Sequence, residues 1–577
     1  MQLDTTAWHR RLAVAVAVAA LVLPTGATAA LLVGPGDPLL DSVVTGIWVL
    51  KGVLLLHALL LWLAPGLETP AEPRGLLRDA GPSEARTASG LQGEGERETG
   101  SRAWAGLPGL IVAGLVLAAL ALRLPELGSG LWFDEVRTLL EYVRRSPGEI
   151  LATFDSTNQH VLYSLAAWAS VAALGESAAA LRLPAVLFGV AGVWAVWWFG
   201  RRVAGEREAL LAAALLAFSY HHVWFSQNAR GYTALLFWTL VSTAFLVDLL
   251  RSTAFSWKTI AGYGVATALA IYTHLTAGAV LVAHAAVTVG LAMRAGEGEA
   301  RVARRSALAG LVLAASLGLL LYAPVVPQAI DTLAARTTPG VAVEWENPLW
   351  LLTETAAGLA RGVPGGFVTL GAGALVFGAG LVSYGRRRPA VTAAMVAPAA
   401  LVLVAAVARS HNLWPRFFFF SAGFGVLIVV RGLFAAAAPL AGAKRRLAGT
   451  VLAVLLVGAS AVTVPRAWGP KQDFRSAGQF LERARGPDDA VAALDLTSLP
   501  LREYLGYDWR APASDRELVR LEGEHRTTWL VYTFPTRVAG VYPEIWRRVQ
   551  EEYERVAAFP GTVRGGAVVI VRRSRSE

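Results

Sequence analysis

The sequence predicts a mainly α-helical, polytopic membrane protein with a small α/β domain at its carboxy-terminal end. The 577-residue chain is 55% hydrophobic and only 16% charged, whereas soluble domains carry about 25% charged residues. Its charges are bunched between apolar runs that are long enough to cross a bilayer. After about residue 466 these runs stop, and short helical and strand-like segments alternate instead.

Thirteen segments have the length and composition of membrane-spanning helices, for which about 20 mainly apolar residues suffice. Two precede a polar linker and eleven follow it, so we expect about 11 core helices plus 2 amino-terminal ones. No internal repeat stands out, which argues against a transporter built from inverted repeats. The predicted spans are residues 12–33, 43–64, 104–123, 181–199, 208–225, 229–250, 258–274, 276–293, 306–327, 366–384, 389–408, 415–434 and 447–465.

Composition divides the chain into four regions. Residues 1–65 form an amino-terminal transmembrane hairpin, and 66–103 are a flexible linker because they are rich in Glu, Arg, Gly, Ser and Pro. Residues 104–465 form the transmembrane core, with a first outer loop at 124–180, and 466–577 form the α/β domain. The elements expected in that domain are helices at 473–485 and near 543–555 and strands at 490–494, 528–534 and 567–572.

The first span also has features of a signal peptide. Arg10 and Arg11 precede it, and Ala27-Thr28-Ala29 resembles a small-residue cleavage site. The apolar run is long for a signal peptide and a second hydrophobic segment follows at once, so we favour a retained hairpin. Lys51, inside the second span, is interpreted as a snorkelling or packed residue.

Residues 160–174 decide the topology, because about 15 apolar residues are short for a span. If this segment lies flat at the membrane interface, all arginine-rich loops of the core share one face, which the positive-inside rule makes cytoplasmic. We therefore expect an interfacial helix, a cytoplasmic linker, and a first loop and α/β domain outside the plasma membrane. The basic clusters are Arg201, Arg202 and Arg207; Arg251 and Lys258; Arg294, Arg301, Arg304 and Arg305; Arg386, Arg387 and Arg388; and Lys444, Arg445 and Arg446.

Two adjacent carboxylates lie in the first outer loop. Asp134 and Glu135 follow Trp132-Phe133, an aromatic pair that we expect to hold the acids at the membrane–water boundary. A carboxylate there has the chemistry to deprotonate an incoming hydroxyl as a general base, or to bind a divalent cation through oxygen. Two solvated loop acids are the simpler alternative. The sequence thus implies no certain cofactor and leaves metal dependence open.

Three arginines are predicted at the same membrane level. Arg230 lies where two helices join, Arg416 opens the span at 415–434, and Arg182 precedes Leu183-Pro184. Arginine binds phosphate oxygens in bidentate fashion and stabilises a departing phosphate in a transition state. Snorkelling toward ordinary anionic lipids is the competing interpretation.

Other chemistries have little support in the sequence. The chain has no cysteine, which excludes disulfides and thiolate sites. Its histidines show no convincing zinc-ligand spacing, and we find no phosphate-binding glycine loop and no nucleophile elbow. The net charge of +10 comes from clusters beside apolar segments, so we expect membrane lipids and no nucleic acid as partners.

Taken in order, these motifs resemble the GT-C superfamily of membrane glycosyltransferases, and within it the protein O-mannosyltransferase and aminoarabinose-transferase-like group (family 39, RgtA/B/C/D-like). The resemblance covers about residues 104–435. The motifs are Leu131-Trp132-Phe133-Asp134-Glu135, Gln159-His160-Val161-Leu162-Tyr163, Leu181-Arg182-Leu183-Pro184, Ser226 to Tyr232, Tyr272-Thr273-His274 and Pro415-Arg416-Phe417.

The resemblance implies an inverting glycosyltransferase at the outer membrane face. It would move a sugar from a polyprenyl-phosphate donor to a hydroxyl of a lipid, glycan or protein acceptor. Asp134 would be the catalytic base and Glu135 would assist acceptor or cation binding. The donor phosphate would be held by Arg230 and Arg416, with Arg182 as a third cation. The expected substrate-binding residues are Tyr232, His160, Gln227 and His274.

Two positions depart from the family pattern. Val161-Leu162 follow His160 where many members have Pro-Pro, and Asn228 stands where many have Glu, so no acid is expected at that site.

Three other functions stay open. A transporter or flippase would place ionisable groups near the bilayer midplane, whereas here they cluster at helix ends, with Lys51 and His284 as exceptions. A lipid-linked oligosaccharide polymerase or ligase would not need the acidic pair, and a non-catalytic scaffold would need no site at all. The distinguishing feature is whether Asp134, Arg230 and Arg416 converge on one outer-facing cavity.

Overall fold

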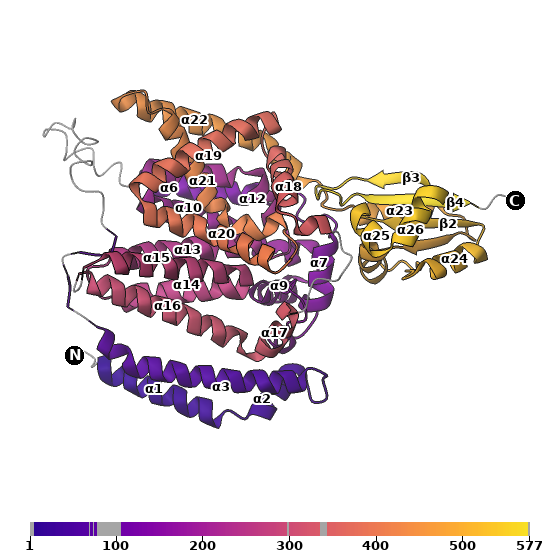
Figure 1. Ribbon diagram of the computed structural model, residues 1–577. Coiled ribbons are helices and arrows are strands. Elements are labelled where there is room, and N and C mark those ends of the chain that lie inside the picture. Colours follow the sequence, from indigo (N-terminus) through magenta and orange to yellow (C-terminus); the bar gives the residue numbers. More distant parts are fainter. Residues whose placement is uncertain are drawn as a thin grey trace.

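The computed structural model describes residues 5–68, 70–72, 74–77, 106–296, 299–334 and 343–574. A bundle of long apolar helices carries a small α/β domain at one end (Figure 1). Among the described residues, nine helices are long and apolar enough to cross a membrane, or eleven if each of two bent helix pairs is one span. The protein is therefore a multi-pass membrane protein. Most of the predicted linker 66–103 lies outside the described residues.

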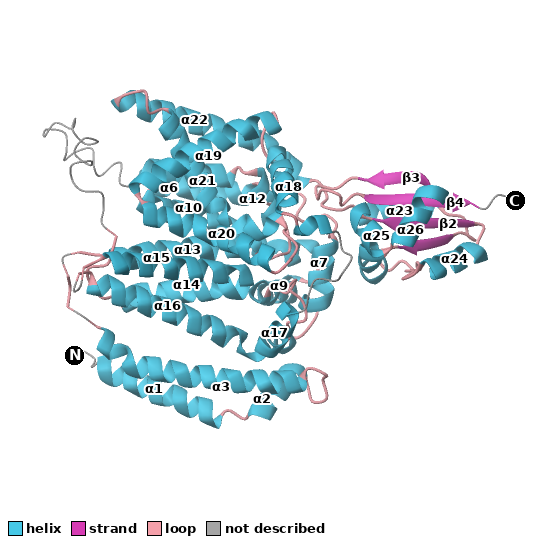
Figure 2. Ribbon diagram, viewed as in Figure 1, coloured by secondary structure: helices cyan, strands magenta, loops and turns pink. Residues whose placement is uncertain are grey.

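Every predicted span coincides with a helix or with a bent pair of helices (Figure 2). The pair α1–α2 bends by 78° and the pair α11–α12 by 60°. The elements that coincide with the predicted spans are α1 (Thr5–Val22), α2 (Thr25–Val33), α3 (Leu40–Leu63), α6 (Leu107–Ala121), α10 (Ala178–Val203), α11 (Glu206–Ala217), α12 (Tyr220–Ser226), α13 (Tyr232–Arg251), α14 (Trp257–Thr273), α15 (Gly278–Arg294), α16 (Arg301–Tyr322), α19 (Phe367–Arg387), α20 (Pro389–Ala408), α21 (Ala422–Ala436) with the 3₁₀ turn Pro415–Ser421 before it, and α22 (Gly442–Thr463). Of these, α6 and α14 are shorter than the candidate spans counted above.

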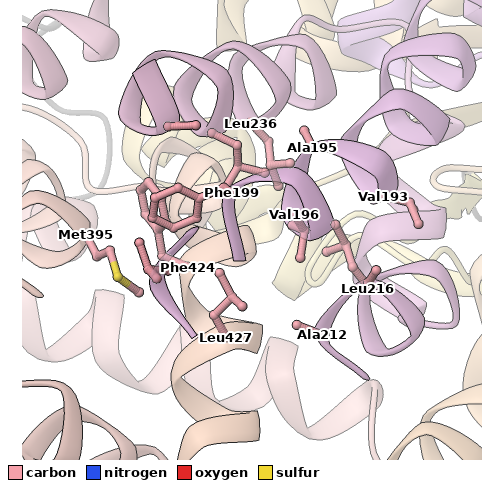
Figure 3. Close-up of a cluster of buried hydrophobic side chains, with 14 of the residues drawn as sticks. Val193, Ala195, Val196, Phe199, Ala212, Leu216, Leu236, Met395, Phe424 and Leu427 are labelled. Atoms are coloured by element: carbon pink, nitrogen blue, oxygen red, sulfur yellow. The ribbon is translucent and has the colours of Figure 1, made fainter. Parts of the chain in front are cut away.

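The centre of the bundle is packed from α10, α11, α13, α20 and α21 (Figure 3). Phe199 of α10 meets Phe424 of α21 edge-on, with ring centroids 5.4 Å apart. Small residues let neighbouring helices approach closely. A Cβ on Gly432 of α21 would collide with the backbone carbonyl of Val376 in α19, so this crossing requires glycine.

A buried arginine supports the break between α11 and α12. A helix that breaks leaves carbonyls without partners. Arg123 donates to one of them, the oxygen of Ala217, at 3.4 Å, and to Ser226 Oγ at the far end of α12 at 2.9 Å. The bent span therefore delivers the turn at residues 226–230 to a fixed place.

Lys51 supports the corresponding break in the amino-terminal hairpin. Its ammonium donates to the carbonyls of Leu21 and Leu23, 3.4 and 3.1 Å away, where α1 ends. It also lies over the Trp48 ring. These contacts agree with the interpretation of Lys51 as a packed residue.

The two ends of the bundle differ in chemistry. At one end, Arg202 of α10 forms an ion pair with Asp248 of α13 at 3.0 Å, and its carbonyl accepts from Arg251 and Arg388. Three of the predicted basic clusters therefore meet there. The opposite end carries the shorter helices and the α/β domain (Figure 1). These helices are α7 (Phe133–Thr138), α8 (Pro147–Ala152), α9 (Val161–Leu174), α17 (Val326–Ala334) and α18 (Pro348–Arg361).

Helix α9 is the segment that sets the predicted topology. It has 14 residues, so it is about 21 Å long at ~1.5 Å per residue. The hydrocarbon core is about 30 Å thick. An interfacial position, as predicted, suits this length better than a span.

The α/β domain has a four-stranded sheet in the order β1-β2-β4-β3. Strand β1 pairs parallel with β2, whereas β4 pairs antiparallel with β2 and β3. The expected helix near 543–555 ends earlier, because the chain turns into an unpredicted edge strand whose first three residues are exposed. The elements are α23 (Phe474–Ala484), β1 (Ala490–Ala493), α24 (Asp515–Glu524), β2 (Thr527–Tyr532), α25 (Pro535–Val541), α26 (Pro543–Glu552), β3 (Glu554–Phe559) and β4 (Val568–Ser574).

Candidate active site

The acidic loop is anchored by protein. Trp132 is only 4% exposed, and its Nε1 donates to Asn228 Oδ1 at 3.2 Å. Phe133 packs against the core of the α/β domain. The expectation that this aromatic pair anchors the acids in the membrane interface is therefore corrected, because the turn at 226–230 and the α/β domain cover the two rings.

Glu135 is completely buried and bound by arginine. Arg182 forms a two-pronged ion pair with it, Nε to Oε1 at 2.8 Å and Nη2 to Oε2 at 2.6 Å. The same carboxylate accepts from the backbone N–H of Ala229 at 2.8 Å and of Trp132 at 3.3 Å. Burial raises the pKa of Glu135, but the charge and hydrogen bonds of Arg182 outweigh burial, so its net pKa lies below the usual value. The pair ties α7 to α10 and to the turn at 226–230.

Asp134 faces the other way, into a cavity. It is 7% exposed and accepts one hydrogen bond from Arg416 Nη1 at 2.9 Å. The Nε of Arg416 is buried and has no hydrogen-bond partner among the described residues. This carboxylate–arginine pair is therefore only partly satisfied and open to a ligand.

Arg230 lies in the same cavity wall. Its Nη1 donates to Thr138 Oγ1 at 3.2 Å, and its Nε, like that of Arg416, finds no partner in the described part of the chain. Its Nη2 lies 3.1 Å from His160 Nε2. His160 Nδ1 accepts from the N–H of Gly231 at 2.9 Å, so a neutral ring carries its proton on Nε2. Both groups are then donors, which favours an acceptor that contacts the two of them.

Charge and burial keep the histidines neutral. Burial, and then the positive charges of Arg230 and Arg416, place the pKa of His160 well below its usual value. Burial, Arg230 and Arg416 lower the pKa of His274 to about 3. The two rings meet edge-on with centroids 4.7 Å apart, and Tyr232 packs against His160 at 5.3 Å. They form an uncharged wall beside the two arginines.

These side chains surround one cavity of about 510 Å³. Asp134, Arg230 and Arg416 all line it, as do His160, Tyr232 and His274. The α/β domain closes one side with Phe534, Arg537 and the turn at 562–564. This convergence was the condition that distinguished an enzyme from a transporter or a scaffold.

A second, mainly apolar cavity of about 600 Å³ adjoins the first. Pro415, Arg416 and Phe225 line both. Its other walls come from α19, α20 and α21, with Phe377, Met395 and Phe424 among the side chains. A charged head group at Arg416 with an apolar chain behind it matches this pair of cavities.

Two residues that were predicted to bind ligands, Arg182 and Gln227, form hydrogen bonds with other parts of the protein instead. All three guanidinium nitrogens of Arg182 are engaged, by Glu135 and by oxygens of Leu127, Ser129 and Gly130. Gln227 Nε2 donates to the carbonyls of Arg123 and Pro125. Neither residue is among those that line the first cavity. Their geometry favours a positioning role over direct contact with the donor.

Several residues of the site have no signal in the local sequence. Trp345 and Trp414 pack with ring centroids 4.8 Å apart, and Arg416 lies over the Trp414 ring. From the start of the α/β domain, Gln472 reaches the acidic loop and Lys471 reaches the turn at 226–230. Clusters of tryptophan in outer loops were the one hint that the sequence offered.

A metal centre has no ready ligand set here. Within the described ranges no group of three or more His, Asp or Glu side chains is placed to hold a metal ion. Asp134 is paired with Arg416, and its neighbour Glu135 with Arg182.

Residues 159–327 match the family model described as dolichyl-phosphate-mannose-protein mannosyltransferase. The match includes His160, Arg182, Arg230 and His274, and it ends before Arg416. The predicted resemblance to the protein O-mannosyltransferase-like group is confirmed over this stretch. No curated protein sequence matches the chain.

Several solved structures are similar to this chain at low identity. ArnT from Cupriavidus metallidurans bound to undecaprenyl phosphate is 15% identical, with a TM-score of 0.45 over 82% of this chain and 98% of that one. The apo oligosaccharyltransferase of Archaeoglobus fulgidus is 12% identical, with a TM-score of 0.49 over 82% and 75%. Arabinosyltransferase EmbB from Mycobacterium smegmatis is 13% identical, with a TM-score of 0.37 over 73% and 43%.

Proposed function

We propose that the protein is an inverting glycosyltransferase that moves a sugar from a polyprenyl-phosphate donor to an acceptor hydroxyl at the outer membrane face. The observation that carries the proposal is the cavity in which Asp134 meets Arg230 and Arg416. One carboxylate and two incompletely satisfied cations are what hydroxyl attack with phosphate departure requires.

The donor phosphate binds at the arginines. Each has a buried Nε without a partner in the described residues, and guanidinium groups favour phosphate oxygens in paired hydrogen bonds. His160 Nε2–H adds a third donor beside Arg230. The apolar cavity behind Arg416 then receives the isoprenoid chain.

Donor binding prepares the base. Asp134 is held by Arg416 at 2.9 Å, and a phosphate at Arg416 competes for that guanidinium. The carboxylate, released from Arg416, is then free to accept a hydrogen bond from the acceptor hydroxyl. It accepts the proton of the acceptor hydroxyl while the hydroxyl oxygen attacks the anomeric carbon. The bond between the anomeric carbon and the phosphate oxygen breaks. The polyprenyl phosphate departs, and its charge is stabilised by Arg230 and Arg416.

The arrangement of carboxylates in the cavity favours inversion of configuration at the anomeric carbon. Retention through a glycosyl-enzyme needs a second carboxylate free to act as nucleophile. Among the described residues that line the cavity, the other carboxylate is Glu354, which forms an ion pair with Arg564 at 2.8 Å, and Glu135 is locked by Arg182. A single displacement by the acceptor therefore fits best.

The sidedness follows from the two ends of the bundle. The arginine-rich end is the cytoplasmic one by the positive-inside rule. The α/β domain, whose residues Phe534 and Arg537 line the cavity, lies at the opposite end (Figure 1), and this supports transfer at the outer face of the plasma membrane.

The test is sugar transfer by purified protein in detergent. A panel of radiolabelled polyprenyl-phosphate sugars is offered with a mixed cell-envelope acceptor fraction. We expect label transfer from one donor, its loss in Asp134→Asn, and its retention in Glu354→Gln, the matched carboxylate control from the same cavity. Folded wild-type protein that transfers label from no donor would contradict the proposal.

A further inference from the structure

Residues 470–472 form a strap between the transmembrane core and the α/β domain. On the core side, Gln472 Oε1 accepts the backbone N–H of Phe133 at 3.1 Å, and Lys471 Nζ donates to the carbonyl of Gln227 at 2.6 Å. Phe133 directly precedes Asp134, and Gln227 belongs to the turn that holds Arg230. Both strap contacts therefore meet segments that carry proposed site residues.

The same strap is bound from the other side by the α/β domain. Gln472 Nε2 donates to Thr533 Oγ1 at 3.1 Å. The N–H groups of Thr562 and Val563 donate to the carbonyls of Pro470 and Lys471 at 2.8 and 3.2 Å. A Cβ on Gly561 would collide with the Lys471 carbonyl, so the two backbones lie as close as they can.

The strap side chains are buried. Lys471 is 6% and Gln472 1% exposed. The Lys471 ammonium lies 5.1 Å from the centroid of the Trp224 ring, and Trp224 Nε1 donates to Thr562 Oγ1 at 2.8 Å. A buried polar group that connects two elements is costly to form unless every hydrogen bond is made. In this arrangement both ends of the Gln472 amide are hydrogen-bonded.

We infer that Gln472 is a positioning residue through which the α/β domain fixes the acidic loop for transfer, while Lys471 holds the neighbouring turn at 226–230. The inference rests on the proposed function, because it concerns the placement of the proposed base. Gln472 acts where a small displacement matters most: Phe133 is the first residue of α7 and Asp134 the second. The free N–H groups of a first helical turn need outside acceptors, and Gln472 supplies one from a different domain.

The first test measures the loop directly and needs no substrate. Gln472→Met keeps the length of the side chain and removes both hydrogen bonds. We expect faster amide hydrogen exchange in peptides that contain Phe133 and Asp134, by about tenfold, which corresponds to ~1.4 kcal/mol of lost protection. Gln479→Met, an exposed position on α23, is the matched control and leaves that exchange unchanged. Equal exchange in Gln472→Met and wild type would overturn the inference.

The second test separates positioning from folding. We expect the kcat of Gln472→Met to fall about tenfold or more, since a misplacement of ~1 Å costs up to about 100-fold, while its donor KM stays within about twofold of wild type. Thr533→Val lowers kcat in the same direction and adds little to Gln472→Met, because the two act through one hydrogen bond. If wild type is active and Gln472→Met has a normal kcat, the inference is contradicted and the proposed function stands. If wild type itself is inactive, the proposed function alone is contradicted.

Discussion

Two neighbouring residues, Asp134 and Glu135, form two ion pairs of different character. Glu135 and Arg182 are both buried, bidentate and fully engaged. Asp134 and Arg416 share one hydrogen bond, line a cavity, and leave the Nε of Arg416 without a partner among the described residues. Successive residues of a helix point about 100° apart, so the start of α7 turns one acid into the protein and the other toward the cavity.

The difference between the two ion pairs indicates two different roles. A saturated buried pair holds segments together, and removing one partner leaves an isolated charge. A pair with spare hydrogen-bonding capacity holds its groups ready for a ligand. The predictions below test this division, starting with the largest expected effect.

The replacement Asp134→Asn removes the proposed base and keeps its shape. We expect the transfer rate to fall by about 10²- to 10⁴-fold, the usual contribution of a general base. The melting temperature of the detergent-solubilised protein should change little, because the introduced side-chain amide still accepts a hydrogen bond from Arg416. Initial rates at saturating donor, with melting curves on the same samples, measure both. A large drop in melting temperature would assign Asp134 to structure as well.

The replacement Glu135→Ala leaves Arg182 buried without its counter-charge. We expect a loss of about 3–5 kcal/mol in the free energy of unfolding, the usual result of breaking a buried pair. Arg182→Met should cost a similar amount, and the double variant should cost less than the sum of the two. Chemical denaturation in detergent measures these values. Glu135→Ala with wild-type stability would contradict the structural role.

The replacement Arg416→Gln removes one of the two cations proposed to bind the donor phosphate. A hydrogen bond to a charged group contributes about 1.5–3 kcal/mol, so we expect the donor KM to rise about 10- to 100-fold. The donor KM of Arg416→Lys should lie between those of wild type and Arg416→Gln, because lysine keeps the charge but lacks the planar guanidinium with its paired N–H donors. Steady-state kinetics with varied donor concentration check this. An unchanged donor KM in Arg416→Gln would remove Arg416 from the phosphate site.

Acid should weaken the Glu135–Arg182 ion pair specifically. Arg182 holds the pKa of Glu135 below its usual value despite burial, so this pair stabilises the fold above the unfolded-state pKa of about 4.3. That stability is lost as the pH falls through the lower folded-state value. The melting temperature of wild type should therefore fall more steeply below about pH 4.3 than that of Glu135→Gln. Parallel curves would contradict the assignment.

Much of this architecture is readable from hydropathy, and the spans and the α/β domain appear where apolar runs start and stop. The order of the acidic loop and the arginines also gives the members of the cavity, since each lies where a helix meets the same end of the bundle. The hydrogen-bond partners of these residues are not readable from the sequence. Arg416 reaches Asp134 across 282 positions of sequence and Gln472 reaches Phe133 across 339. No local pattern distinguishes the arginine that binds Glu135 from the one that binds Asp134, so Arg182 was expected at the phosphate.

The most direct test of the division between base and binding cations is donor affinity without turnover. Binding of a polyprenyl phosphate to wild type, Asp134→Asn and Arg416→Gln is measured in detergent by calorimetry. We predict that Asp134→Asn binds as tightly as wild type or more tightly, because Arg416 loses its competing carboxylate, while Arg416→Gln binds about tenfold or more weakly. Weakened binding in Asp134→Asn, equal to that of Arg416→Gln, would contradict the account.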